Sequence, residues 1–165
     1  MSFLHPLISL YTGRVADLLF TFLSGATESG KSFASKLLTS QLLRLSASAT
    51  KRERKLASEI QNFDTVLAAF GYAKTKSNAN ASRFSRYTEL HYNEQGRLAG
   101  AQVLAFGLDK RRMNRVERDE RTFHVFYQML AGASSGEREA LRLEDVTSYS
   151  LLNQSGCFRG ASNPF

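Results

Sequence analysis

Eight residues at positions 25–32 constrain the fold of this chain more than any other feature. They read Gly25-Ala26-Thr27-Glu28-Ser29-Gly30-Lys31-Ser32 and match the pattern G-x-x-x-x-G-K-[ST] without a mismatch. The apolar residues 20–23 before this motif favour a short buried strand, and the helical spacing of apolar residues from Lys31 onward favours a helix after it. A strand, a glycine-containing loop and a helix in this order predict an α/β fold built around a phosphate-binding loop, or P-loop.

The residue types in this motif point to nucleotide chemistry. Gly25 and Gly30 let the backbone curl so that successive N–H groups point at phosphate oxygens, and the helix N-terminus adds partial positive charge. Lys31 would neutralise the β- and γ-phosphates, and the Ser32 hydroxyl would bind Mg²⁺, which prefers oxygen ligands. The alternative interpretation is a strand-to-helix turn with an incidental lysine.

Hydrophobic spacing predicts the other elements. An amphipathic helix is expected over residues 5–19, a helix with one buried face over 31–45, and a second helix that is ended by Gly71. Residues 87–92 and 98–108 predict a β-hairpin, and residues 120–131 predict a third helix. Ser134 with Glu137 is typical of a capping box before a short fourth helix. Residues 156–165 show no periodicity.

Composition limits the class of protein. With 22 Lys and Arg against 15 Asp and Glu the net charge is +7, but the basic clusters at 51–55 and 110–118 are interleaved with acidic residues, which favours solvated helix faces or loops over a docking groove. Nucleic-acid binding is not expected, because Phe123, Phe126 and Tyr127 are typical of a helix core. No apolar run reaches the roughly 20 residues of a membrane span, and a single cysteine cannot form an internal disulfide. A cytoplasmic location is therefore expected.

Other candidate site residues are weaker. The apolar stretch that ends at Asp109 is similar to a Walker B strand, but its place in a hairpin followed by basic residues favours a coincidence. His91 and His124 have no second ligand at metal-binding spacing. Cys157 has no histidine base nearby in sequence, which favours a packed thiol over a nucleophile.

Four segments together resemble the myosin motor domain in order and spacing. They are residues 25–32, Ala68-Ala-Phe-Gly-Tyr-Ala-Lys-Thr75, Asn78-Ala-Asn-Ala-Ser-Arg-Phe84 and Phe123-His-Val-Phe-Tyr-Gln-Met-Leu-Ala-Gly-Ala133. Residues 42–46, 86–91, 106–110, 155–157 and 164–165 are also similar to the myosin-motor-like domain at the N-terminus of fungal chitin synthases. The resemblance implies a partial P-loop NTPase-like core with a mixed sheet, a β-hairpin and flanking helices. It divides the chain into a divergent lead-in (1–22), a family-like core (23–155) and an irregular tail (156–165).

The resemblance also assigns residues 78–83 to switch I, the loop that closes over the nucleotide. It implies that Asn78 and Asn80 lie near the phosphates of ATP, that Ser82 is a second Mg²⁺ ligand beside Ser32, and that Arg83 pairs with a carboxylate from switch II. Switch II and the main actin-binding elements are expected beyond Phe165, so Arg83 is expected to have no ion-pair partner in this chain.

Three interpretations remain open at this point. The first is an ATP-binding piece of a motor-like domain that helps a fungal chitin synthase to be delivered or tethered along actin. The second is a nonhydrolysing interaction module, because Ala81 stands where myosins usually carry a serine that handles the lytic water. The third is a truncated product that does not fold alone, because its sheet edges and apolar faces would lie uncovered. No catalytic residue is assigned, and the chitin synthase glycosyltransferase domain is not expected in this chain.

Overall fold

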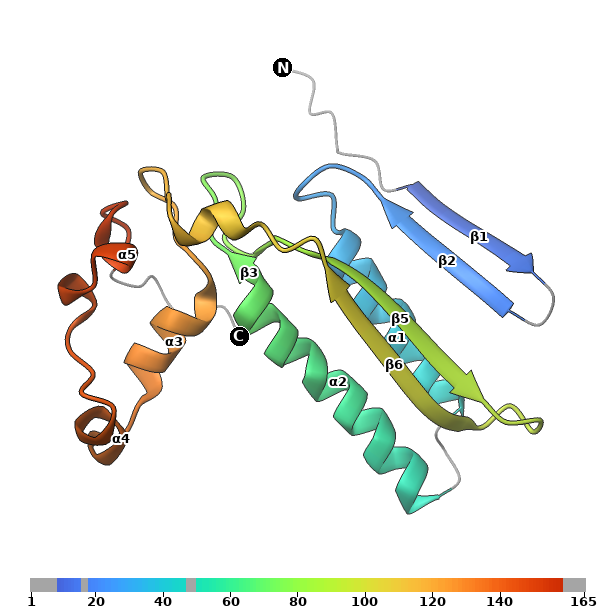
Figure 1. Ribbon diagram of the computed structural model, residues 1–165. Helices are drawn as coiled ribbons and strands as arrows, with labels where there is room; N and C mark the ends of the chain where they lie inside the picture. The colour runs from blue at the N-terminus through green and yellow to red at the C-terminus, as the bar shows by residue number, and fades with distance from the viewer. Residues whose placement is uncertain (1–8, 16–17, 47–49, 159–165) are drawn as a thin grey trace. The chain divides into compact units, whose positions relative to one another are not determined.

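The computed structural model describes residues 9–15, 18–46 and 50–158. The chain divides into two compact units, one made from Met1–Ala57 with Tyr92–Ala99 and the other from Ser58–His91 with Gly100–Phe165, and each is described by itself. Figure 1 labels the helices and strands. Their bounds are β1 Ser9–Val15, β2 Leu18–Ser24, α1 Lys31–Ser46, α2 Lys51–Gly71, β3 Tyr72–Ala73, β4 Ala81–Ser82, β5 Ser85–Tyr92, β6 Leu98–Phe106, the 3₁₀ helix η1 Lys110–Met113, α3 His124–Gly132, α4 Ser135–Ala140, the 3₁₀ helix η2 Val146–Ser148 and α5 Ser150–Asn153.

The first unit opens with two paired strands. β1 and β2 are antiparallel along their whole length, with Ser9 opposite Ser24 and Val15 opposite Leu18. The helix expected over residues 5–19 is therefore wrong for 9–15 and for 18–19, which begin β2, and residues 5–8 and 16–17 lie outside the described part. A segment with tyrosine, threonine and valine fits a strand once a partner strand satisfies its backbone hydrogen bonds.

Helix α1 has the predicted bounds but not the predicted burial. It runs over Lys31–Ser46, and among its residues only Leu43 and Ser46 are buried. Phe33, Leu37 and Leu45 are 67%, 55% and 73% exposed, so the expected buried face is wrong for the part of the chain that the structure describes. Spacing creates an apolar stripe locally, whereas burial needs a second apolar surface to cover it.

Helix α2 begins at Lys51 with a capped first turn. Thr50 and Glu53 form a capping box, in which the Thr50 N–H donates to the Glu53 carboxylate (3.0 Å) and the Glu53 N–H donates to the Thr50 hydroxyl (3.2 Å). The helix ends at Gly71 as predicted, but the glycine is required by packing. A Cβ at this position would lie 2.3 Å from two ring carbons of Phe84.

The second unit has a small buried centre around β3. Ala73 pairs with Ala81 of β4 and also bridges to Phe123, both in antiparallel fashion, and all three side chains are buried. Asp64 of α2 forms an ion pair with Arg86 of β5. The predicted hairpin is confirmed: β5 and β6 pair with each other in a two-stranded sheet. The strand pairs of the described residues form small separate sheets, so the predicted mixed sheet is not found there.

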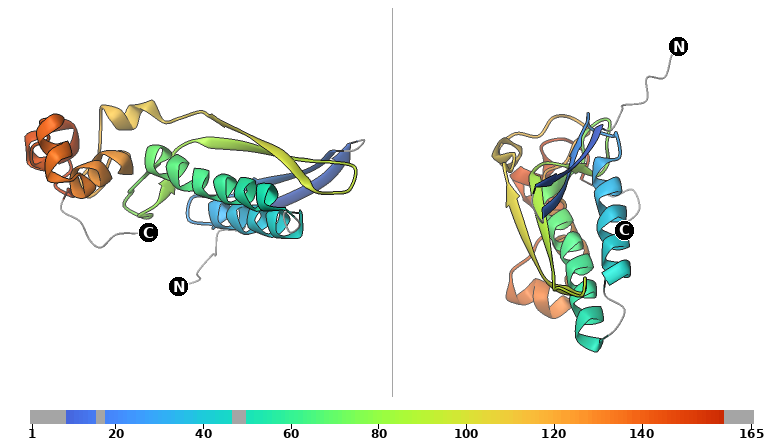
Figure 2. Two further views of the ribbon diagram at one scale, coloured as in Figure 1. Left: turned by 90° about the horizontal axis from the view of Figure 1, so that it is seen from below. Right: turned by 90° about the vertical axis from the view of Figure 1, so that its right-hand side faces the viewer.

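The C-terminal helices of this unit lie together in Figures 1 and 2. Helix α3 starts at His124, four residues later than predicted, because the preceding residues are used elsewhere: the Thr122 hydroxyl donates to the Arg112 carbonyl at 3.0 Å, and Phe123 bridges to β3. The predicted capping box of α4 is confirmed, with both Ser134–Glu137 hydrogen bonds present. Helix α5 was not predicted, and residues 159–165 of the predicted tail lie outside the described part.

Candidate functional site

The P-loop candidate lies between β2 and α1 in the first unit. β2 ends at Ser24 and α1 begins at Lys31, so the predicted order of strand, loop and helix is confirmed (Figure 1). The expected burial of this strand is wrong, because Phe20 and Phe22 are 49% and 60% exposed. Gly30 has φ = 86°, a backbone conformation that glycine adopts readily. Glu28 has φ = 66°, which is uncommon for a residue with a side chain and is found more often at ligand-binding loops.

Lys31 folds back over this loop. Its ammonium group donates to the Ala26 carbonyl oxygen and to the Ser29 hydroxyl at 3.3 Å. The Ser29 N–H also donates to the Ala26 carbonyl (3.3 Å), so the loop is closed by its own residues. The side chain of Ser32 is exposed. The arrangement places a positive charge and the first free N–H groups of α1 at one end of a helix, where an anion is stabilised.

The switch I-like residues 78–83 lie in the second unit and begin with a tight turn. Thr75 and Asn78 bond to each other: the Thr75 N–H donates to the Asn78 carbonyl (2.8 Å), and the Asn78 N–H donates to the Thr75 hydroxyl (3.0 Å). The Asn78 side-chain oxygen then accepts from the Asn80 N–H at 2.9 Å. These bonds hold a segment that composition alone describes only as a surface loop.

The side chain of Asn80 contacts helix α3. Its Oδ1 lies 3.0 Å from Nε2 of His124, which is only 7% exposed. Burial, together with the nearby positive charge of Arg121, lowers the pKa of His124, so this imidazole is neutral at pH 7. An amide oxygen can only accept a hydrogen bond, so Nε2 carries the proton.

Ala81 and Ser82 form strand β4. Ala81 is 1% exposed and packs in the buried centre around β3. Ser82 is exposed, and its hydroxyl donates to the Phe84 carbonyl at 3.2 Å. Because the hydroxyl hydrogen is used in that bond, the oxygen lone pairs stay available to a cation.

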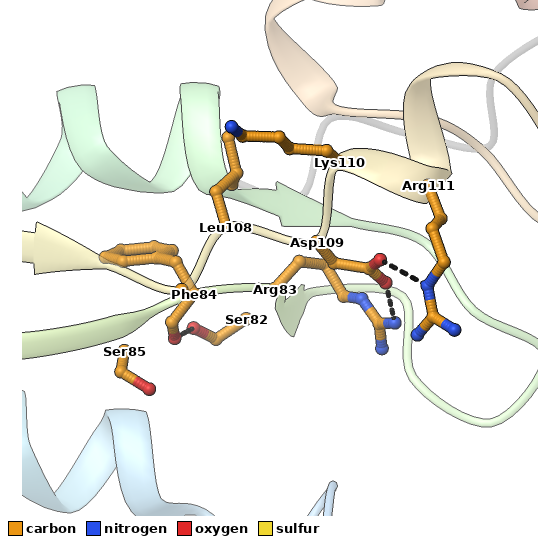
Figure 3. A pocket seen from close by; sticks show the side chains of 9 residues that line it. Ser82, Arg83, Phe84, Ser85, Leu108, Asp109, Lys110 and Arg111 are labelled. Carbon is orange, nitrogen blue, oxygen red and sulfur yellow. Dashed lines mark hydrogen bonds and ion pairs between the residues drawn. The ribbon is translucent and has the colours of Figure 1, made fainter.

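Arg83 has an ion-pair partner, which corrects the expectation from the sequence. Its guanidinium pairs with the Asp109 carboxylate, and Arg111 Nε lies 3.4 Å from the other carboxylate oxygen (Figure 3). The hydrogen bond from Arg83 is the main cause that lowers the pKa of Asp109. The expectation failed because the partner, Asp109, lies in the loop after β6, and the fold brings this loop next to Arg83. In the sequence, Asp109 is only an aspartate at the end of an apolar strand.

Beside this pair the surface has a hollow of about 580 Å³ that is open to solvent. Its lining residues come from the end of switch I and from the loop after β6: Ser82, Arg83, Phe84, Ser85, Gly107, Leu108, Asp109, Lys110 and Arg111. The aspartate that resembled the end of a Walker B strand is thus held by two arginines. In the described part of the chain, no group of three or more His, Cys, Asp or Glu side chains could hold a metal ion.

Cys157 is partly exposed and lies in a basic environment. Lys74 Nζ donates to its sulfur at 3.1 Å, and Arg121 Nε donates to its carbonyl oxygen at 2.7 Å. Arg121 also lies over the ring of Tyr127, 5.2 Å from the centroid. These contacts attach Cys157 to the residue after β3 and to the segment before α3, a structural use of the cysteine.

Comparison with known proteins decides the family. The model of the myosin head (motor domain) matches residues 19–162. The chain belongs to the myosin motor-domain family. Its relatives among myosins include the myosin-I heavy chain of Dictyostelium discoideum, 38% identical over 137 residues that make up 83% of this chain and 6% of that protein. Myosin-1 of Arabidopsis thaliana is 39% identical over 130 residues, 79% of this chain and 11% of that protein.

Fungal chitin synthases are relatives of this myosin-family chain as well. Chitin synthase 8 of Mycosarcoma maydis is 39% identical over 145 residues, which make up 87% of this chain and 7% of that protein. The resemblance to both groups that the motifs indicated is confirmed. The chain spans about a tenth or less of the length of these relatives. No helix in the described residues is long and apolar enough to cross a membrane.

Proposed function

We propose that this chain binds ATP together with Mg²⁺ as part of a myosin motor domain. The observation that carries the proposal is the loop 25–32 between β2 and α1, where Lys31 lies across the loop at the start of a helix. In this proposal the backbone N–H groups from Gly25 to Ser32 surround the phosphates and Lys31 neutralises their charge. The exposed Ser32 hydroxyl is the first protein ligand of Mg²⁺.

By resemblance to the myosin motor domain, residues 78–83 are the switch I-like segment of the proposed function. The exposed hydroxyl of Ser82 has free lone pairs and suits a hard cation such as Mg²⁺. The Asn78 side-chain oxygen accepts from the Asn80 N–H, and the Asn80 side-chain oxygen accepts from His124 of α3. In this proposal it is therefore the amide nitrogens and the backbone of these residues that lie near the phosphates. Arg83 is paired with Asp109 and contributes positive charge that is already partly neutralised.

A second candidate function is a nonhydrolysing binding module. The observation in its favour is Ala81, which has no hydroxyl to handle a water molecule and whose methyl group is buried in the unit. In this candidate the loop 25–32 is retained as part of the fold, the basic clusters bind actin or another partner, and ATP is not hydrolysed. A measurement of phosphate release from ATP by the wild-type chain and by Ala81→Ser would decide: release restored by the hydroxyl supports the nonhydrolysing assignment of the natural chain.

The wider role follows from the relatives. Because they are myosins and chitin synthases, we propose that a longer protein containing this chain links chitin synthesis to actin, by delivery or by tethering. The exposed parts of the basic clusters would face acidic actin in that case. Cosedimentation of the protein with actin filaments, with and without MgATP, tests this part independently of nucleotide binding.

Thermal unfolding tests nucleotide binding directly. At a ligand concentration of 100 times the dissociation constant, binding adds about 2.7 kcal/mol, which for a chain of this size raises Tm by roughly 5 to 10 °C. The shift should be lost in Lys31→Ala and kept in Lys36→Ala, a matched control because Lys36 is an exposed lysine of α1 outside the loop. EDTA should reduce the shift, and so should Ser32→Ala and Ser82→Ala.

An equal shift in Lys31→Ala and in the wild-type chain would contradict the assignment of the loop. A cooperative transition that MgATP does not move would contradict nucleotide binding altogether. The absence of any transition would support the interpretation that this chain does not fold alone.

A further inference from the structure

One partly buried hydrogen bond joins the switch I-like segment to helix α3. Nε2 of His124 lies 3.0 Å from Oδ1 of Asn80, and these residues are 44 positions apart in the chain. His124 is the first residue of α3 and is almost fully buried. We infer that His124 is a positioning residue for Mg²⁺-dependent nucleotide binding, since its Nε2–H holds Asn80 and thereby the backbone that carries Ser82. This inference rests on the proposed function.

Asn80 is held at two points. Its N–H donates to the side-chain oxygen of Asn78 (2.9 Å), and its own side-chain oxygen accepts from His124. The next two residues are the strand β4, where Ala81 pairs with Ala73 and Ser82 pairs with Tyr72. Because this strand is only two residues long, the position of the Asn80 backbone sets the position of Ser82.

His124 is itself held in place by the same small sheet. Phe123, the preceding residue, bridges to Ala73, so β3 contacts β4 on one side and the start of α3 on the other. Both ends of the His124–Asn80 bond are therefore anchored to Ala73. A substitution at His124 would remove the hydrogen bond to Asn80, while the contacts of Phe123 and Ala81 with Ala73 remain.

The chemistry of the pair suggests the variants to use. Gln places an amide N–H close to the position of Nε2 and keeps the donor, whereas Phe keeps a ring of similar size and removes it. In His124→Phe the side-chain oxygen of the half-buried Asn80 loses its partner, which costs more than the loss of a fully exposed hydrogen bond would. Tyr127→Phe is the matched control, since it removes one hydrogen bond of the same helix, from the Tyr127 hydroxyl to the Leu152 carbonyl (3.2 Å), away from Asn80.

The first measurement is the affinity for ATP with and without Mg²⁺, determined by titration of the protein with a fluorescent ATP analogue. His124→Phe should weaken binding with Mg²⁺ by about tenfold, a typical effect of one hydrogen bond, and should weaken binding without Mg²⁺ less. His124→Gln should restore the affinity to within about twofold. Tyr127→Phe should lower Tm without changing the Mg²⁺ dependence, which separates positioning from general stability.

The second measurement does not depend on nucleotide. Hydrogen exchange at the amides of Asn80 and Arg83, which donate to Asn78 and Gly71, should speed up in His124→Phe and not in Tyr127→Phe. Unchanged exchange in His124→Phe would overturn the inference even if the chain binds no ATP. If the wild-type chain binds MgATP and His124→Phe binds it equally well, the inference is wrong and the proposed function stands.

Discussion

Arg83 and Asp109 are joined twice, once through their side chains and once through their backbones. The guanidinium and the carboxylate form an ion pair, and the Asp109 N–H donates to the Arg83 carbonyl at 2.9 Å. The Arg83 N–H in turn donates to the Gly71 carbonyl at 2.9 Å. This connection ties the end of the switch I-like segment to the end of α2 and to the loop after β6, all within the second unit.

Asp109→Asn should destabilise the chain by about 1–3 kcal/mol, because it leaves the partly buried Arg83 without its counter-charge. Glu117→Gln is the matched control: Glu117 pairs with Lys76 through side chains that are both more than half exposed, and such a pair contributes at most about 1 kcal/mol. Urea unfolding of the two variants measures the difference. Equal losses would mean that the Arg83–Asp109 pair does not stabilise the unit more than a surface pair does.

Gly71→Ala should destabilise by about 1–3 kcal/mol, because its methyl group would overlap the ring of Phe84 at 2.3 Å. Gly132→Ala, at the end of α3, meets no atom within 4 Å and should be neutral or stabilising by up to about 1 kcal/mol. Thermal melts of both variants check the contrast. The double variant Gly71→Ala with Phe84→Ala should recover part of the loss, and no recovery would place the strain elsewhere.

Stability should fall as the pH is lowered from 7.5 to 5.5, partly because of His124. Its pKa is lowered in the folded state by burial and by Arg121, so the unfolded chain binds more protons once the pH drops below the ordinary histidine value of about 6.5. The stabilisation is complete above that value and is lost toward the folded-state pKa. Melts across this pH range should show a steeper decline in the wild-type chain than in His124→Gln; parallel curves would be evidence against it.

Ser134→Ala should weaken helix α4 by about 1 kcal/mol, because the Ser134 hydroxyl accepts from the Glu137 N–H at its first turn. Ser135→Ala, one position later, changes an exposed serine inside the helix and should have little effect. Hydrogen exchange at the Glu137 amide reports the cap. Faster exchange in both variants alike would show that the serine hydroxyl is not what protects it.

Local patterns accounted for the elements whose causes lie within a few residues. The bounds of α1 follow from the spacing after Lys31, the hairpin β5–β6 from two strand patterns close together in the sequence, and the start of α4 from Ser134 and Glu137. The P-loop pattern was read in the same way, and its context between a strand and a helix is confirmed. Each of these depends on hydrogen bonds or side-chain directions between near neighbours in the chain.

Tertiary structure alone decided which distant residues contact the elements that these patterns predict. The sequence by itself supplies the side chains of Asn80, Arg83, Asp109 and His124. Only the fold brings Asn80 into contact with His124, 44 positions away, and Arg83 into contact with Asp109, 26 positions away. It also decided that β1 is a strand, because its backbone bonds are made to β2, and that the stripe of α1 stays largely exposed. Contacts between distant residues depend on the path of the whole chain, and no short window of sequence contains that path.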